Sequence, residues 1–234
     1  MKSEKPTFIS LFSGIGGLDL GLERAGWRCV AQVEKDEWCR RVLAKHWPDV
    51  ERHDDVRTFD PGHIEHTYGR PDLIAGGFPC QDISSAGRRA GLQGPHSGLW
   101  VEMFRVVREV RPRFVLVENV AGLARRGLGQ VLGDLASVGF DAVWRCIPAA
   151  AVGANHLRAR LFLLAHAGGE RDGLQAQEIP AGWDEPQYSN WWDTEPGVGR
   201  VDDGVPHRVD RLRGLGNAVV PQVAEYLGRL ILDG

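Results

Sequence analysis

The chain has 234 residues, of which 43% are hydrophobic and 25% are charged, and its formal net charge is −3. These values are typical of a globular protein with one large domain and a small additional element. No run approaches about 18 apolar residues, and the N-terminus passes directly into a strand-like segment. We therefore expect neither export nor membrane insertion, but a cytoplasmic protein.

Charge is unevenly distributed along the chain. Six arginines lie between Arg105 and Arg126 with only two acids, whereas the stretch from Glu170 to Glu195 has seven acids and one arginine. A slightly acidic total can therefore hide one basic face. The four cysteines form no Cys-x-x-Cys pair and no zinc-ribbon spacing, so we expect all of them to be reduced.

Strand-like and helix-like segments alternate through the first two thirds of the chain. Strands are predicted at 6–12, 27–33, 72–77, 113–119, 140–146 and 160–166, and helices at 18–27, 36–47, 99–110 and 129–139. Repeated strand–helix units predict an α/β fold with a doubly wound, mostly parallel sheet and helices on both of its faces.

The alternation stops after His166. Residues 167–208 are rich in Gly, Pro, Asp, Glu and Trp and show no period, which predicts a small irregular insert. Val219, Val223, Leu227 and Leu230 then predict one amphipathic helix, with Pro221 near its first turn. The expected organisation is a domain at 1–166, the insert at 167–208, and a C-terminal part at 209–234 that completes the domain.

A glycine-rich turn and two acids point to a nucleoside ligand. Gly14 and Gly16 follow the first strand, and glycines let the backbone approach a ligand closely. Glu34 comes 20 residues after Gly14 at the end of the second strand, where a carboxylate can bind both hydroxyls of a ribose. Asp55 follows near the next strand end, where it could hold the amine of an adenine. A simple tight turn with solvated acids is the alternative.

One of the four cysteines lies in a stretch whose composition is typical of an exposed loop. The stretch GGFPCQDIS (residues 76–84) follows the apolar run 72–75 and places Cys80 in a loop rich in glycine and serine. A structural cysteine would more naturally lie within the apolar run, where it behaves as a small hydrophobe. The position of Cys80 favours a reactive thiol.

These motifs together resemble one family. FSGIGG (12–17), GGFPCQDIS, VLVENV (115–120), LRAR (157–160) and LGNAVVPQV (215–223) occur in the order of the cytosine-C5 DNA methyltransferases. The resemblance covers nearly the whole chain except the insert. It implies a Rossmann-like class I methyltransferase fold that uses S-adenosyl-L-methionine and releases S-adenosyl-L-homocysteine, with no metal.

The resemblance also implies catalytic roles. The family's chemistry needs a nucleophile at cytosine carbon 6, which Cys80 would supply, and an acid near N3, which Glu118 would supply. We expect the environment of Glu118 to raise its pKa, because it must be protonated when it acts. Arg158 and Arg160 would bind the cytosine carbonyl and order Glu118 and the thiol.

The resemblance also implies further cofactor-binding residues. Because Lys35 stands where many relatives have an aromatic residue, adenine stacking is expected to depend more on Phe12 and Val56. Asn217 could instead be a helix N-cap. The full set of cofactor-binding residues expected is Phe12, Gly14, Gly16, Glu34, Asp55, Val56, Pro79, Leu99, Asn217, Ala218 and Val219.

The expected partner is double-stranded DNA, bound by a monomer. The target cytosine must be flipped out of the duplex, and the segment 80–97 is expected to close over it as a mobile loop. Residues of this loop expected at the DNA are Gln81, Ser84, Arg88 and Arg89.

Some features depart from the family pattern. His156 and Asn155 replace the usual glutamine and proline before LRAR, and the short insert resembles that of compact members encoded by viruses or mobile elements. The implied location is the cytoplasm of a prokaryotic or virus-infected cell. Two alternatives are an RNA methyltransferase of the same fold, against which the absence of a Cys-Phe-Thr triplet speaks, and a catalytically silent DNA-binding relative, against which the intact catalytic set speaks.

Overall fold

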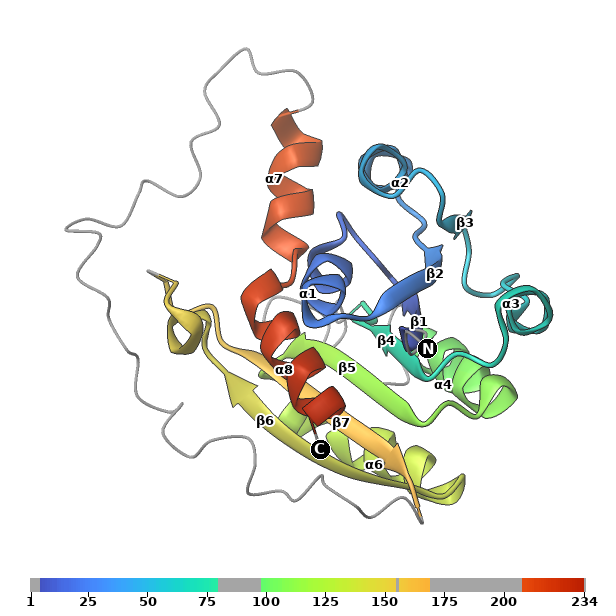
Figure 1. Ribbon diagram of the computed structural model, residues 1–234. Helices are drawn as coiled ribbons and strands as arrows, with labels where there is room; N and C mark the ends of the chain where they lie inside the picture. The colour runs from blue at the N-terminus through green and yellow to red at the C-terminus, as the bar shows by residue number, and fades with distance from the viewer. Residues whose placement is uncertain (1–4, 80–97, 155, 169–207, 234) are drawn as a thin grey trace.

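The computed structural model describes residues 5–79, 98–154, 156–168 and 208–233, and these form helices around one seven-stranded sheet (Figure 1). The order of the strands is β3-β2-β1-β4-β5-β7-β6. The first five strands in sequence are parallel, and β7 is antiparallel to both β5 and β6. The strands are β1 (Thr7–Leu11), β2 (Arg28–Val33), β3 (Glu51–His53), β4 (Leu73–Gly76), β5 (Phe114–Val120), β6 (Phe140–Ile147) and β7 (Arg160–Ala167). The predicted doubly wound, mostly parallel sheet is confirmed.

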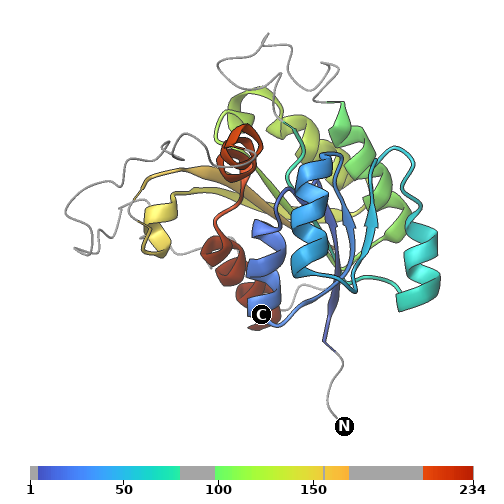
Figure 2. The same cartoon turned by 90° about the horizontal axis from the view of Figure 1, so that it is seen from above.

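Helices cover both faces of the sheet (Figure 2). One face packs against α3 (Pro61–Tyr68), α4 (Leu99–Val110), α5 (Leu123–Arg126) and α6 (Leu128–Ser137). The other packs against α1 (Gly17–Ala25), α8 (Pro221–Asp233) and the short 3-10 helix η2 (Ala149–Val152). Two more helices are α2 (Glu37–His46) and α7 (Arg208–Asn217), and Arg213 of α7 pairs with Asp36, the N-cap of α2. Across the described ranges, no helix combines the length and apolar character that a membrane crossing requires.

The buried pattern explains these layers. All five residues of β1 are buried, as expected for a central parallel strand that is covered on both faces. In α4 the buried residues Trp100, Met103, Val107 and Val110 recur at helical spacing and form one apolar stripe. The stripe faces the sheet, so the helix is held mainly by burial of this face.

The two ends of the chain meet in the second layer. Leu18 and Leu22 of α1 share a buried cluster with Val223 and Leu227 of α8. The indole of Trp27, which lies just before β2, donates a hydrogen bond of 3.0 Å to the carbonyl of a residue in α8. The C-terminal helix is therefore part of the same core as the first strand and helix.

The C-terminal part differs from the prediction in one respect. The sequence predicted one helix that included Val219, but the structure has two, α7 and α8, with Val219 between them. Pro221 is the first residue of α8, and a proline disfavours helical geometry in the residue before it. Asn217 is the last residue of α7, so its interpretation as an N-cap is wrong.

Candidate active site

The expected site residues gather at one edge of the sheet. Parallel strands β1, β2, β3 and β4 end there, and Phe12, Glu34, Asp55 and Pro79 follow those ends in the sequence. Strand β7 runs in the opposite direction, so it begins at this edge, with Arg160 paired to Val120 at the end of β5. Binding sites of doubly wound sheets lie at the carboxyl ends of the strands.

The turn after β1 has the geometry that its glycines predict. Gly14 and Gly16 have positive φ angles of 57° and 85°, and Phe12 also has a positive φ, of 56°. The amide of Ser13 donates to the carbonyl of Val33, at 3.2 Å, which fixes the turn against the end of β2. A positive φ is uncommon for a non-glycine residue, so surrounding contacts must hold Phe12 in place.

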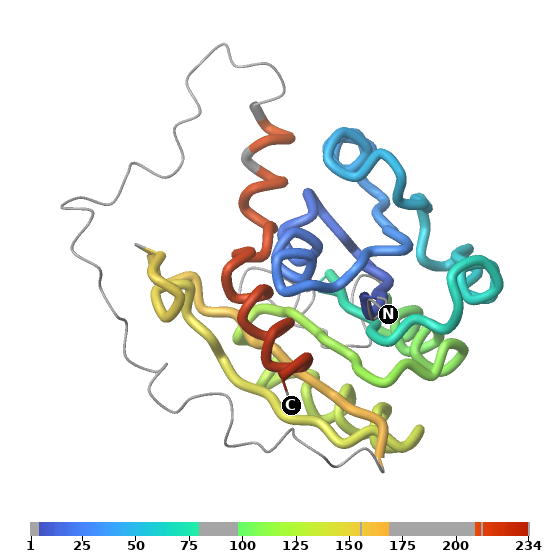
Figure 3. Tube along the Cα trace, viewed as in Figure 1, coloured from blue at the N-terminus to red at the C-terminus, as the bar shows by residue number. Residues whose placement is uncertain are grey.

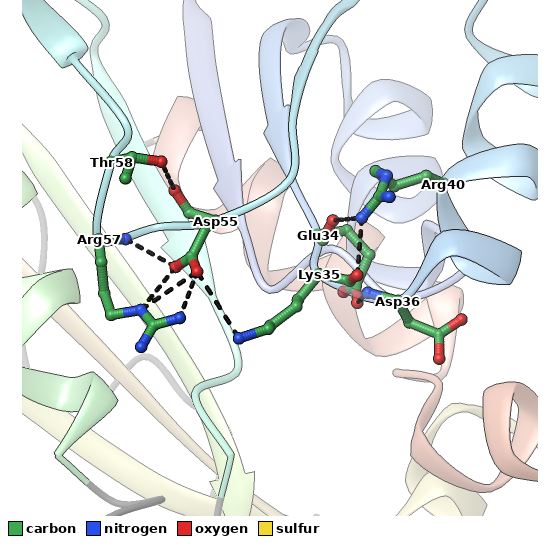
Figure 4. A network of polar contacts seen from close by, with 7 residues as sticks. All are labelled: Glu34, Lys35, Asp36, Arg40, Asp55, Arg57 and Thr58. Atoms are coloured by element: carbon green, nitrogen blue, oxygen red, sulfur yellow. Dashed lines mark hydrogen bonds and ion pairs between the residues drawn. The ribbon is translucent and has the colours of Figure 1, made fainter.

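Glu34 is held by the backbone on both of its oxygens. The amide of Gly14 donates to Oε2 at 2.8 Å, and the amide of Asp36 donates to Oε1 at 2.7 Å. Arg40 donates to the carbonyl of Glu34, at 3.0 Å (Figure 4). Each carboxylate oxygen retains a second lone pair, so this fixed carboxylate can still accept hydrogen bonds from a ligand.

Asp55 lies beside two cations (Figure 4). The Nε of Arg57 donates to Oδ1 of Asp55 at 2.9 Å, and the Nη2 of Arg57 contacts Oδ2. Lys35 places its Nζ 3.6 Å from the same Oδ2. The Arg57 hydrogen bonds hold the pKa of Asp55 well below its usual range. The carboxylate is thus fully ionised near neutral pH, and an adenine amine would share it with Arg57.

Glu118 is a buried acid next to a cation. Its Oε1 lies 3.3 Å from Nε of Arg160, and its side chain is 11% exposed. Burial raises the pKa of Glu118 to about 7, although Arg160 and Arg158 act in the opposite direction. The expected rise in pKa is therefore found. A carboxyl with this pKa is present in both protonated and ionised forms near neutral pH, as general acid catalysis requires.

The acid is packed against the strand exit that leads to the thiol. A Cβ on Gly77 would lie 2.8 Å from Oε2 of Glu118, so a larger residue there would displace the carboxyl from its present position. The side-chain amide of Asn119 donates to the carbonyl of Phe78, at 3.1 Å, and ties the exit of β4 to β5. No role was expected for Asn119, whose only signal in the sequence is its place beside Glu118 in VLVENV.

The two arginines of the LRAR run have different contacts. Arg160 contacts Glu118, whereas the Nη2 of Arg158 donates to the carbonyls of Gly216 and Ala218, at 2.7 Å each. Arg158 also has a positive φ of 24°. In this structure Arg158 therefore binds the C-terminal segment, and Arg160 is the residue that contacts the acid.

The structure also shows where other residues of the predicted cofactor pocket lie. The carbonyl of Val219 lies against Gly17 at the start of α1, so Ala218 and Val219 are next to the glycine turn, whereas Asn217 is exposed. Val56 is buried, and Leu99 opens α4 and packs against the core. Cys29 and Cys39 are buried, and neither forms a disulfide within the described residues. Outside the described residues lie Cys80, Gln81, Ser84, Arg88 and Arg89, and most of the insert.

The fold and the residues at this edge of the sheet define the class of protein. A doubly wound sheet with an added antiparallel strand and a carboxylate after β2 beside a glycine turn place the chain in the class of Rossmann-like methyltransferases. The chain belongs to the C-5 cytosine-specific DNA methylase family, whose family model matches residues 6–191.

Known relatives support this placement. The Type II methyltransferase M2.BsuMI of Bacillus subtilis is 36% identical over 165 residues, which are 67% of this chain and 41% of that protein. M.HgiCII of Herpetosiphon aurantiacus is 32% identical over 191 residues, 78% of this chain and 40% of the relative. The chain thus spans less than half the length of these relatives.

Solved structures agree on the fold. A DNA modification methyltransferase encoded within an E. coli prophage superposes with a TM-score of 0.59 at 27% identity, covering 69% of this chain and 47% of that one. The DNMT2 protein of Spodoptera frugiperda gives a TM-score of 0.62 at 18% identity, covering 74% and 53%, and supports the fold alone.

Proposed function

We propose that this protein is a DNA cytosine-5 methyltransferase that uses S-adenosyl-L-methionine and acts on double-stranded DNA. The observation that carries the proposal is the arrangement around Glu118, a buried carboxyl with a raised pKa beside Arg160. It is packed against Gly77, three residues before Cys80. This chemistry requires an acid and a thiol on the same substrate ring.

The proposed roles follow from the electron flow on cytosine. The thiolate of Cys80 adds to carbon 6, and the electron pair moves into the ring toward N3 and carbon 5. Glu118 donates its proton to N3 and so neutralises the developing charge. When bound, S-adenosyl-L-methionine supplies the methyl group that carbon 5 accepts. Solvent water then takes the carbon 5 proton, the Cys80 thiolate leaves carbon 6, and the N3 proton returns to Glu118, which restores the aromatic ring.

The cofactor residues fit the adenosine part of this molecule. The Glu34 carboxylate is fixed by two backbone amides beside the turn that holds Phe12, which supports its proposed contact with both ribose hydroxyls. Phe12 is only partly buried and offers apolar surface at the same edge, where it packs against the core cluster that contains the buried Val56. Asp55 would accept the adenine amine while keeping its contact with Arg57.

The DNA contacts are assigned to parts of the chain outside the described residues. Segment 80–97, with Gln81, Ser84, Arg88 and Arg89, would contact the flipped cytosine and nearby phosphates. The insert at 167–208 would read the sequence, between a catalytic part at 1–166 and a C-terminal part at 209–234. A short insert offers few base contacts, each worth roughly 1 to 3 kcal/mol of discrimination, so we propose a context of about two to four specified bases.

One experiment tests the proposal. The protein and its Cys80→Ser variant are expressed in a host that lacks cytosine methylation, and the DNA is analysed by conversion sequencing. Wild type should leave cytosines protected in one short context, and the variant should protect none. A folded wild-type protein that protects no cytosine in DNA would contradict the proposal. If cytosines were protected in RNA alone, the substrate would be RNA.

A further inference from the structure

Helix α7 stands at the rim of the proposed cofactor site, beside the beginning of α1 and α2 (Figure 3). Its Arg213 forms an ion pair with Asp36, the residue that begins α2 as its N-cap. Gly214 faces the same region, because a Cβ there would lie 2.7 Å from the ring of Trp38 and 3.1 Å from Ile15. One turn of α7 therefore packs on both the glycine turn and the start of α2.

Asp36 joins this contact to the proposed ribose acid. Its backbone amide donates to Oε1 of Glu34 at 2.7 Å, and its Oδ1 accepts the amide of Cys39 at 3.0 Å. Burial alone would raise the pKa of Asp36, but the Cys39 amide and the charge of Arg213 outweigh it, and the pKa is lowered. The ionised Asp36 is thus fixed by the helix on one side and by α7 on the other.

The C-terminal end of α7 is held by Arg158, which lies just before β7. Arg158 donates to the carbonyls of Gly216 and Ala218 at 2.7 Å each. Gly216 is only three residues beyond Arg213, so one short helical segment touches both places. The contacts form a continuous path from Glu34 through Asp36, Arg213 and the end of α7 to Arg158.

We propose that Arg213 is a positioning residue that couples cofactor binding at Glu34 to the placement of α7, and through α7 to Arg158. The inference rests on the proposed function, because it takes Glu34 to be the cofactor acid. Ordering of residues 34–36 by a bound ribose would strengthen the Asp36–Arg213 contact. Coupling of this kind is reciprocal, so a well-placed α7 also favours cofactor binding.

The degree of exposure argues for positioning over general stability. The side chains of Arg213 and Asp36 are 56% and 26% exposed, and ion pairs this accessible to water contribute little to global unfolding free energy. The pair nevertheless joins two elements that are distant in sequence, α7 and the loop before α2. Its loss should therefore change how α7 responds to ligand more than it changes whether the protein folds.

Amide hydrogen exchange with S-adenosyl-L-homocysteine tests the coupling. The measured quantity is the ratio of exchange rates in α7 without and with this ligand, because a ratio cancels any general weakening of the helix. In wild type we expect the ligand to slow exchange in α7 by about fivefold or more, the usual lower range of allosteric coupling. In Arg213→Gln the ratio should fall below about twofold, while protection of the 13–17 turn by the ligand persists.

Four further variants make the test specific. Asp36→Asn keeps an N-cap acceptor and removes the charge, so it should lose the α7 response as Arg213→Gln does, and the double variant should lose no more. Arg213→Lys should restore part of the response. Arg229→Gln is the matched control, because Arg229 forms an ion pair only within α8 in the contacts described, with Glu225 at 2.8 Å, and should keep the wild-type ratio.

The outcomes separate the two proposals. A wild-type α7 that does not respond to bound S-adenosyl-L-homocysteine, or an unchanged response in Arg213→Gln and Asp36→Asn, would overturn the coupling and leave the proposed function intact. Calorimetry that detects no binding of this ligand to wild type would overturn the cofactor assignment and, with it, the coupling.

Discussion

Glu118 and Arg160 meet across two antiparallel strands, with Oε1 of the acid 3.3 Å from Nε of the arginine. An adjacent guanidinium normally lowers the pKa of a carboxyl, yet the pKa of Glu118 is raised to about 7 because burial outweighs the charges of Arg160 and Arg158. The Glu118 carboxyl is therefore present in both its protonated and its ionised form near neutral pH.

Glu118→Gln should lower the rate of methyl transfer by a factor of about 10² to 10⁴, the usual contribution of a general acid. The amide has nearly the same shape, so binding of S-adenosyl-L-homocysteine should remain close to that of wild type. Single-turnover methylation and calorimetry measure the two quantities. A variant with full activity would remove Glu118 from the proposed acid role.

Arg160→Gln should move the alkaline limb of the pH–rate profile to higher pH. The protonated form of Glu118 is the proposed active form, so activity is lost as the pH rises through its pKa. Removing the cation takes away a charge that lowers this pKa, and the limb shifts upward. The limb should be absent in Glu118→Gln. A shift to lower pH in Arg160→Gln would show that another group controls the limb.

The sequence predicted the sheet and the site edge because both depend on local patterns. The apolar run of β1 and the glycine turn after it require only neighbouring residues, and Glu34 follows from its distance along the chain. Strand order could place Glu118 near this edge, since carboxyl ends of parallel strands meet there.

The features that the sequence could not predict depend mainly on contacts between segments that are far apart in the sequence. The binding of Arg158 to Gly216 and Ala218 joins residues about 60 positions apart. In helix α7 the apolar side chains of Val209 and Leu215 are exposed, so apolar periodicity could not show how this helix packs, and it contacts Trp38 through Gly214 instead. The Asp55–Arg57 contact was also missed, although the two residues are neighbours, because side-chain pairing leaves no periodic pattern.

Glu34→Gln should weaken binding of S-adenosyl-L-homocysteine by about 1.5 to 3 kcal/mol, the range of hydrogen bonds to a charged group. The amide keeps one oxygen for the Gly14 or Asp36 amide, so the turn should largely persist. Calorimetry gives the affinity. Glu37→Gln on the neighbouring helix is a control, because Glu37 is 75% exposed and should not affect binding. Equal affinities in wild type and Glu34→Gln would exclude this acid from the pocket.

Asn119→Ala should lower the free energy of unfolding by about 1 to 3 kcal/mol, because it leaves the Phe78 carbonyl and the Val120 amide without their present partners. It should also slow methyl transfer, since Phe78 leads directly to Cys80 in the sequence. Urea unfolding measures the first effect and single-turnover methylation the second. Loss of stability with an unchanged rate would limit Asn119 to a structural role.

Asp19 forms a buried polar cluster between α1 and the sheet. Ser10 Oγ donates to one of its oxygens at 2.9 Å, and Gln32 Nε2 donates to the other at 2.8 Å. Burial raises the pKa of Asp19 to about 6, and the hydrogen bonds from Gln32 and Ser10 compensate only in part. The folded protein therefore binds a proton at Asp19 more tightly than the unfolded chain does.

Asp19→Asn should make the protein more stable relative to wild type as the pH rises. With a pKa of about 6 in the folded protein and an ordinary pKa of 3.8, Asp19 favours the folded state most below its unfolded pKa, and this contribution is lost as the pH rises through 6. Asparagine does not titrate, so the stability difference should grow by about 2 kcal/mol between about pH 4.5 and 7.5. Urea unfolding of both proteins across this range measures it. Glu118 titrates in both and cancels in the difference, so a constant difference would mean that Asp19 keeps an ordinary pKa in the fold.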